Sequence, residues 1–158
     1  MATYNAERTE TNSQAVIHPI GTTTVVTTVN LATAKDGAAL VAGDVVNLFH
    51  IPQNATVVAW AVKVPSLGGS GASTVDIGDT ADEDGWVDGG SVTTSAAYGA
   101  NSGTAPTSIP VKYATASLMK FTLKSTGTGA TVAGTLSASI TYSTEFAIPG
   151  STAQTFMA

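Results

Sequence analysis

The chain has 158 residues, of which only 11% are charged, and it carries a formal net charge of −5 with no cysteine. This charge excludes a general nucleic-acid-binding role, because phosphate contacts require a basic face. The absence of cysteine excludes disulfides and thiolate chemistry. The polar start contains no apolar signal-peptide core, and no apolar run approaches the roughly 20 residues of a membrane span, so we expect no membrane partner.

The charged fraction is low against the roughly 25% of an ordinary soluble domain, and Thr, Ala, Gly and Ser take the place of the missing charges. Thr favours strands, and Ser and Gly favour turns. A surface of Ser and Thr repels neighbouring molecules little, which favours repeated contact with other subunits. A simple β-sandwich that acts alone fits the same composition.

The chain divides into a polar N-terminal arm at residues 1–14, one domain at residues 15–146 and a tail at residues 147–158. The arm has no periodicity, which fits either disorder or an extended arm that docks on a neighbour. Residues 22–31, TTTVVTTVNL, form a β-branched run that predicts a strand.

Two apolar runs at residues 45–51 and 56–64 flank Pro52-Gln53-Asn54-Ala55 and predict an antiparallel hairpin. The first run is apolar on both faces, so we expect it to be covered on both sides. In the second run, the small face of Ala59 and Ala61 should lie under a loop or a neighbouring subunit. The large face is predicted to be core and consists of Val58, Trp60, Val62 and Val64.

Two later segments alternate between apolar and polar residues, at 117–125 and 134–146. This period of two predicts half-buried antiparallel strands. Their predicted core residues include Phe121, Leu123, Leu136, Ile140 and Tyr142. About eight strands with almost no helix signal predict an all-β fold, a single antiparallel β-sandwich of jelly-roll type with an extended arm and long loops.

Residues 76–88 contain six acidic side chains and no basic one. Calcium binds several hard oxygen ligands, so the weak calcium candidates here are Asp79, Asp82, Asp84 and Asp88. The EF-hand pattern fails, because Thr80 and Ser91 stand where it requires ligands. A solvated acidic loop is the favoured interpretation, and we expect neither metal nor cofactor. Glycoside hydrolysis is disfavoured, since a single loop holds paired carboxylates poorly.

The sequence predicts no enzyme. His18 and His50 are the only histidines, and no G-x-S-x-G motif accompanies them. The run Gly68-Gly69-Ser70-Gly71 lacks the Lys-Ser/Thr pair of a phosphate loop. Trp86 is the one candidate for stacking on a sugar, and the alternative is that it caps the core.

Four consecutive segments carry a resemblance to a known group of proteins: GDVVNLFHIP, TVVAWAVKVPSLGGSG, STVDIGD and TADEDGWVDGG. In order, they resemble small virion proteins of tailed bacteriophages, in which a strand ends in Ile-Pro, the next ends in a Val-Pro step, and a V-x-I-G-D piece leads into an Asp-rich loop. The late strands at residues 119–123 and 136–142 complete the resemblance, which covers about residues 25–146.

Members of this group are structural, and they act as capsid decoration or cement proteins or as other head components. The resemblance therefore implies a non-enzymatic virion protein on the capsid surface, made in the host cytoplasm. Its partners would be the major capsid protein and further copies of itself, with a homotrimer favoured by closed symmetry. A receptor- or glycan-binding module of a phage tail or fibre is the alternative.

Overall fold

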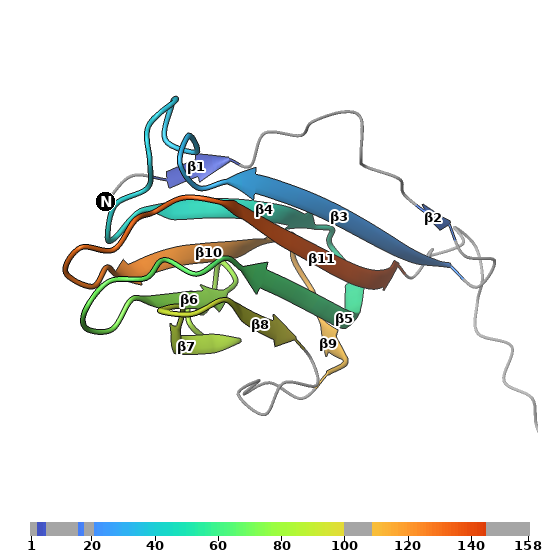
Figure 1. Cartoon of the computed structure of the whole chain (residues 1–158). Coiled ribbons are helices and arrows are strands. Elements are labelled where there is room, and N and C mark those ends of the chain that lie inside the picture. Colours follow the sequence, from blue (N-terminus) through green and yellow to red (C-terminus); the bar gives the residue numbers. More distant parts are fainter. Residues whose placement is uncertain (1–2, 6–15, 18–20, 100–108, 145–158) are drawn as a thin grey trace, which may run out of the picture.

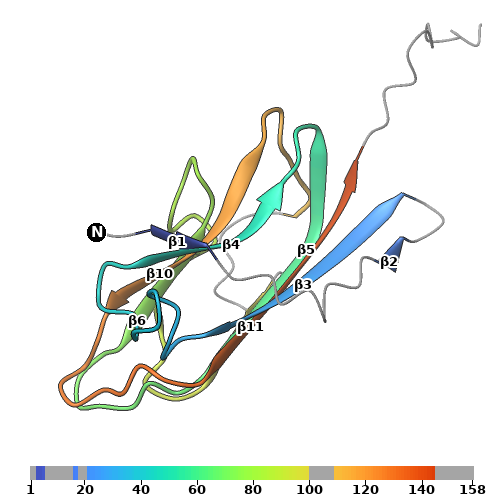
Figure 2. The same ribbon diagram turned by 90° about the horizontal axis from the view of Figure 1, so that it is seen from above.

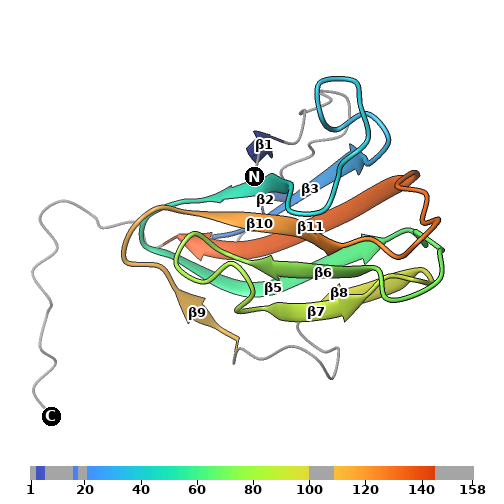
Figure 3. The same cartoon turned by 90° about the vertical axis from the view of Figure 1, so that its left-hand side faces the viewer.

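The computed structural model describes residues 3–5, 16–17, 21–99 and 109–144, and these form two β-sheets that pack face to face. No helix occurs among these residues, and none of them forms a helical span suited to crossing a membrane. The predicted all-β sandwich is confirmed. In Figure 3, β10, β6 and β7 form the nearer layer, and β11, β5 and β8 lie behind them.

Sheet one has the strand order β1-β4-β10-β6-β7. Its members are β1 (Thr3–Asn5), β4 (Val45–Ile51), β10 (Ser117–Ser125), β6 (Thr74–Gly78) and β7 (Val87–Ser91). Sheet two has the order β2-β3-β11-β5-β8, and β9 also pairs with β5. Its members are β2 (Val16–Ile17), β3 (Thr22–Asn30), β11 (Thr135–Thr144), β5 (Ala55–Val64), β8 (Ala96–Gly99) and β9 (Val111–Lys112).

The two sheets arise from one long hairpin that folds over on itself. Along the chain, β3, β4, β5 and β6 pair with β11, β10, β8 and β7 respectively. Folding this ribbon adds the pairs β11 with β5 and β10 with β6, which place the two latest strands inside their sheets. Figure 2 shows the result from above, with β4 and β10 in one layer and β3, β11 and β5 in the other.

The described part of the N-terminal arm is β1, and it pairs with β4 of its own chain. This pair is parallel, whereas the other strand pairs of the described residues are antiparallel. Thr3 lies opposite Val45, so β1 covers the edge of sheet one at the start of β4. The rest of the predicted arm (residues 1–2 and 6–14) and the predicted tail at 147–158 lie outside the described residues.

The core lies between the sheets, and β10 and β11 each lie in the middle of one of its two layers. On β10, the alternating residues Met119, Phe121 and Leu123 are buried, and on β11 Leu136 and Ile140 are buried in the same way. Residues of β5 complete the facing layer with Trp60, Val62 and Val64. Tyr142 packs against this core but is only partly buried.

Strand β4 is buried on both faces over much of its length. Val45 and Val46 are adjacent in sequence, so their side chains point to opposite faces, and each is 1% exposed. Val46 belongs to the core between the sheets, whereas Val45 does not. The outer face of sheet one is therefore covered at the start of β4, as the doubly apolar run predicted.

Val58 is exposed, contrary to the expectation from the alternating pattern. A β-bulge is the reason, because Val57 pairs with Tyr142 and Ala59 pairs with Thr141, which leaves Val58 without an opposite residue. The extra residue inverts the alternation before it. Val57 therefore points into the core at 1% exposure, and Val58 points outward at 39%.

The bulge predicts unequal effects of two similar substitutions. Val57→Ala removes two buried methyl groups and should lower the free energy of unfolding by about 2 kcal/mol. Val58→Ala should change it by less than about 0.5 kcal/mol, because its side chain is exposed. Urea unfolding of both variants measures the difference. Equal losses would contradict the bulge and favour uninterrupted alternation along β5.

Candidate functional site

The acidic edge of sheet one is the most highly charged part of the described chain. Strands β6 and β7 lie at this edge, and residues 79–86 connect them. The side chains of residues 80–84 are exposed, while those at both ends of the connection, Asp79 and Trp86, are buried. The connection is thus an exposed acidic tip held by two buried anchors.

Asp79 is the first anchor. One carboxylate oxygen accepts hydrogen bonds from the backbone N–H of Ala81, at 2.7 Å, and of Asp82, at 3.1 Å. The other oxygen accepts a 2.6 Å hydrogen bond from the buried hydroxyl of Tyr113. Asp side chains that bond to backbone two residues ahead fix turns. Both carboxylate oxygens of Asp79 are therefore used to hold the loop, and this calcium candidate takes a structural role.

Close packing of backbone against backbone fixes the same turn. The N–H of Asp79 donates to the carbonyl of Asp82 at 2.8 Å. A Cβ on Gly78 would overlap that carbonyl oxygen, so only glycine fits at this position. The turn that follows the V-D-I-G-D segment therefore requires the glycine of this segment.

Trp86 is the second anchor. Its side chain is 5% exposed, and its ring centroid lies 5.1 Å from that of Trp60 across the core. Its backbone N–H donates to the carbonyl of Ile77 at 2.9 Å. Such tilted aromatic pairs stabilise cores. Trp86 caps the core, and its buried ring is not presented for stacking on a sugar.

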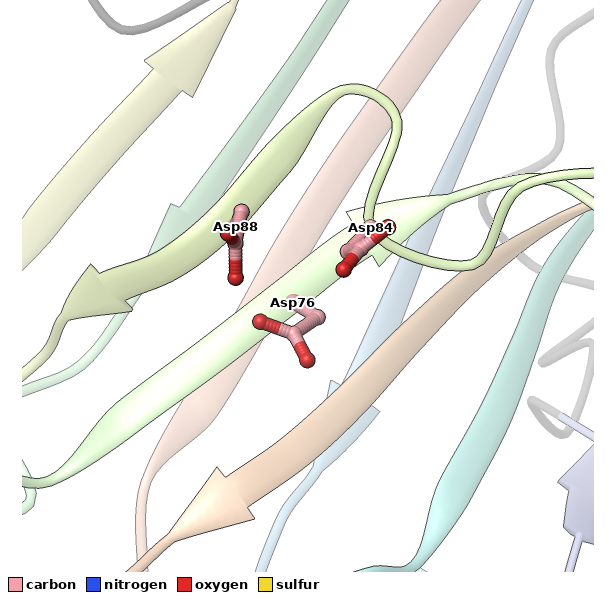
Figure 4. A group of neighbouring side chains, drawn as sticks. All are labelled: Asp76, Asp84 and Asp88. Carbon is pink, nitrogen blue, oxygen red and sulfur yellow. The ribbon is translucent and has the colours of Figure 1, made fainter.

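Three carboxylates gather beside the loop, from Asp76 on β6, Asp84 in the connection and Asp88 on β7 (Figure 4). One oxygen from each lies within 4.8 Å of the others. We call these residues the acidic trio. The structure thus brings together two of the four calcium candidates, Asp84 and Asp88, and adds Asp76.

Sequence reasoning noted Asp76 as acidic but did not include it among the ligands. The signal that could have found it is the alternation of β6, where Val75 and Ile77 are fully buried and Asp76 must point outward. Asp82 lies beside the trio rather than in it. A side-chain hydrogen bond with Asp84 raises the pKa of the Asp82 carboxyl.

Lysines of the neighbouring strand β10 compensate part of this charge. The ammonium group of Lys124 lies 2.6 Å from Asp88 and 3.3 Å from Asp76, and Lys120 lies 2.8 Å from Glu83. The hydrogen bond to Asp88, together with that to Asp76, raises the pKa of Lys124. Exposed ion pairs of this kind contribute little to stability.

The opposite side of the sandwich has a different character. Outward-facing residues of β3, β11 and β5 form registered rows of small or neutral side chains. We call this surface the neutral face, and its rows are Thr24–Thr141–Ala59, Val26–Ser139–Ala61 and Thr28–Ser137–Lys63. Lys63 carries the single charge in these rows. Ala59 and Ala61 are exposed on this face, so no loop of the described residues covers the predicted small face.

Of the two histidines, only His50 lies among the described residues, and it is not part of the acidic edge. His50 is exposed on β4, and His18 lies outside the described residues.

No family model matches the chain, and no curated protein sequence matches it. Its fold is similar to that of a chain in the capsid of Ralstonia phage GP4, with a TM-score of 0.64 and 16% identity, over 91% of this chain and 99% of that one. It is also similar to a chain in the capsid asymmetric unit of cyanophage Pam1, with a TM-score of 0.57 and 15% identity, over 89% and 99% of the two chains. These similarities establish a shared fold over nearly the full length of each chain.

The hydrogen bond to Asp79 predicts that removal of the Tyr113 hydroxyl group lowers the stability of the fold. Tyr113→Phe should lower the free energy of unfolding by about 2 kcal/mol, because a buried carboxylate loses a hydrogen-bond donor. Tyr98→Phe is the matched control, since its hydroxyl donates at 2.6 Å to the neutral carbonyl of Ser91. Urea unfolding at pH 7 should show a smaller loss of unfolding free energy for Tyr98→Phe than for Tyr113→Phe. The reverse order would contradict the role of Asp79 as an anchor.

Tyr113 also predicts that the stability of the fold changes with pH in the alkaline range. Burial, reinforced by the hydrogen bond to Asp79, raises the pKa of Tyr113 above its ordinary value of about 10. The stabilisation linked to this proton is complete below pH of about 10 and is lost as pH rises beyond it, because the unfolded chain then releases the proton first. Tyr113→Phe should therefore lose less stability than the wild type between pH 9 and pH 11. An identical loss in the two proteins would contradict this assignment.

Proposed function

We propose that this protein is a non-enzymatic structural component of a bacteriophage virion that decorates the capsid and stabilises the shell. The observation that carries the proposal is the shared fold with chains from two phage capsids over nearly their whole length. The folded-hairpin strand order supports it, because we classify this order as a jelly roll, an architecture that viral capsid domains use.

The distribution of charge supports a contact through the neutral face. Copies of a chain with a net charge of −5 repel one another, and a surface without acidic residues minimises that repulsion. The exposed apolar residues Val26, at 42%, and Val58, at 39%, lie on β3 and β5 of the same sheet. Their burial would add a favourable hydrophobic term to the contact.

The acidic trio lies on the outer face of the other sheet, on the far side of the sandwich from the neutral face. In the proposed orientation the neutral face meets the major capsid protein or a neighbouring copy, and the acidic edge points to solvent. A small interface alone is weak, so binding would gain from linked copies. A homotrimer on a local threefold axis of the shell is the proposed arrangement.

A carboxylate introduced on the neutral face should weaken binding to shells. Val26→Glu places a carboxylate on this face and should reduce co-sedimentation with undecorated capsids at least tenfold, about 1.4 kcal/mol. Val41→Glu is the matched control, because Val41 is also an exposed valine, at 52%, but lies on the turn before β4. This control should bind like the wild type.

Circular dichroism and thermal melting establish that both variants are folded before the binding is compared. Wild-type protein that fails to sediment with shells would contradict the decoration role. Equal binding of Val26→Glu and the wild type would contradict the neutral face as the contact surface, while leaving the decoration role in place.

A further inference from the structure

We propose that the free edge of β3 pairs with β3 of a second copy of this chain, so that sheet two continues from one molecule into the next. β3 lies on the outer side of β11 (Figure 1), and the described β2 residues pair only with its Thr23 and Thr24. Residues 25–30 therefore have no strand on their outer side among the described residues. This inference goes beyond the proposed function and does not depend on it, because it concerns the isolated protein.

The other sheet edges of the described residues are protected against such pairing. β1 covers the start of β4, and β8 has only 4 residues. β7 carries Asp88 and contains a bulge, since its residues 87–90 lie opposite residues 75–77 of β6. Covering strands, short strands, bulges and charged side chains all keep an edge from pairing with another chain. Residues 25–30 of β3 are uncharged, and no register shift interrupts the pairing of β3 with β11.

The hydrogen bonds of β3 show which residues face the free edge. The N–H of Leu31 donates to the carbonyl of Gly134 at 2.9 Å, which continues the pairing of β3 with β11. The N–H and C=O groups of successive residues point to alternate sides of a strand. The odd-numbered residues of β3 therefore bond toward β11, and the even-numbered residues Val26, Thr28 and Asn30 direct these groups to the free edge. All three residues are exposed.

An antiparallel pair centred on Thr28 fits this edge. Thr28 then lies opposite Thr28 of the second copy, and Val26 lies opposite Asn30 of the second copy. The two Thr28 residues exchange N–H···O bonds, and each Asn30 N–H donates to a Val26 carbonyl of the other copy. β3 ends at Asn30, whose carbonyl accepts a hydrogen bond from the N–H of Thr33 at 3.2 Å. The paired strand of the second copy therefore ends before it reaches Thr24, where β2 lies.

Charge and symmetry favour a second copy as the occupant. Copies with a net charge of −5 repel one another, and an edge without charged residues allows the closest approach. The pairing also places threonine opposite threonine, a cross-strand pair that stabilises sheets. Two identical antiparallel strands are related by a closed two-fold axis. On a shell, this contact would join neighbouring trimers, and the neutral faces of the two copies would form one continuous surface.

The test is oxidative crosslinking of the purified full chain with copper(II) phenanthroline. The natural sequence has no cysteine, so one introduced cysteine limits the product to a covalent dimer. Thr28→Cys reports the pairing, because opposite Cα atoms of a hydrogen-bonded pair lie about 5.5 Å apart, within the range of about 4.4–6.8 Å that disulfides span. Ala61→Cys is the matched control, since it places an exposed cysteine on β5, away from the edge of the neutral face.

Two further changes, each combined with Thr28→Cys, block the edge without touching the bonds to β11. Val26→Pro removes an N–H that faces the free edge, and Val26→Lys adds a charge there, and both are devices that keep edges from pairing. Circular dichroism and thermal melting show whether each variant is folded. The lysine variant carries the comparison if proline at this position unfolds the chain.

We expect Thr28→Cys to form the covalent dimer at least about tenfold faster than Ala61→Cys, because paired cysteines react at a high effective concentration. Either change at Val26 should remove most of this advantage. Equal rates for the two cysteine variants would overturn the edge pairing. Faster crosslinking of Ala61→Cys would instead indicate a face-to-face contact and would also overturn it, as would an unchanged rate in a folded Val26 variant.

Discussion

The sandwich depends on two late strands that insert into the middle of the two sheets. β10 lies between β4 and β6, and β11 lies between β3 and β5, so each closes a sheet whose other members come earlier in the chain. Their inward side chains, such as Phe121 and Ile140, meet in the core with almost no exposure. Without β10, β4 is separated from β6, and without β11, β3 is separated from β5, so each sheet depends on pairing between distant parts of the chain.

The same arrangement separates two surfaces of opposite character. The outward side of β10 carries lysines that face the acidic edge of β6 and β7, whereas the outward side of β11 carries serine and threonine. The acidic side chains thus lie on one face of the sandwich, whereas Lys63 is the single charged residue in the rows of the other face. This asymmetry is the physical basis of the proposed orientation, with neutral contacts toward a partner and carboxylates toward solvent.

Sequence alone predicted the features that depend on local alternation. The pattern from Ser117 to Ser125 indicated which side chains of β10 face the core, and the small residues Ala59 and Ala61 predicted a face that lies under a loop or a neighbouring subunit. The bulge was not predictable, because Val57 and Val58 are chemically identical and the register of β11 decides which of them is buried. The inversion shows how one extra residue overrides a regular pattern.

Prediction from the sequence was limited in the same way at the acidic edge. The six acids were evident in the sequence, but their roles depend on partners that are distant in the chain. The sequence made Asp79 a calcium candidate. In the structure its carboxylate accepts a hydrogen bond from Tyr113, which lies 34 residues away in the chain. Asp76 joins the trio through the pairing of β6 with β7, and Lys124 reaches it from β10. Such roles follow from sheet topology, which residue spacing does not encode.

We propose that this sandwich is a virion component that attaches through its neutral face. Electron cryomicroscopy of capsid shells saturated with the protein tests it most directly. We expect density for the sandwich on the shell, with the outer faces of β3, β11 and β5 against the shell or a neighbouring copy and residues 79–86 in solvent. Shells without added density, or a contact formed by residues 79–86 with the neutral face in solvent, would contradict it.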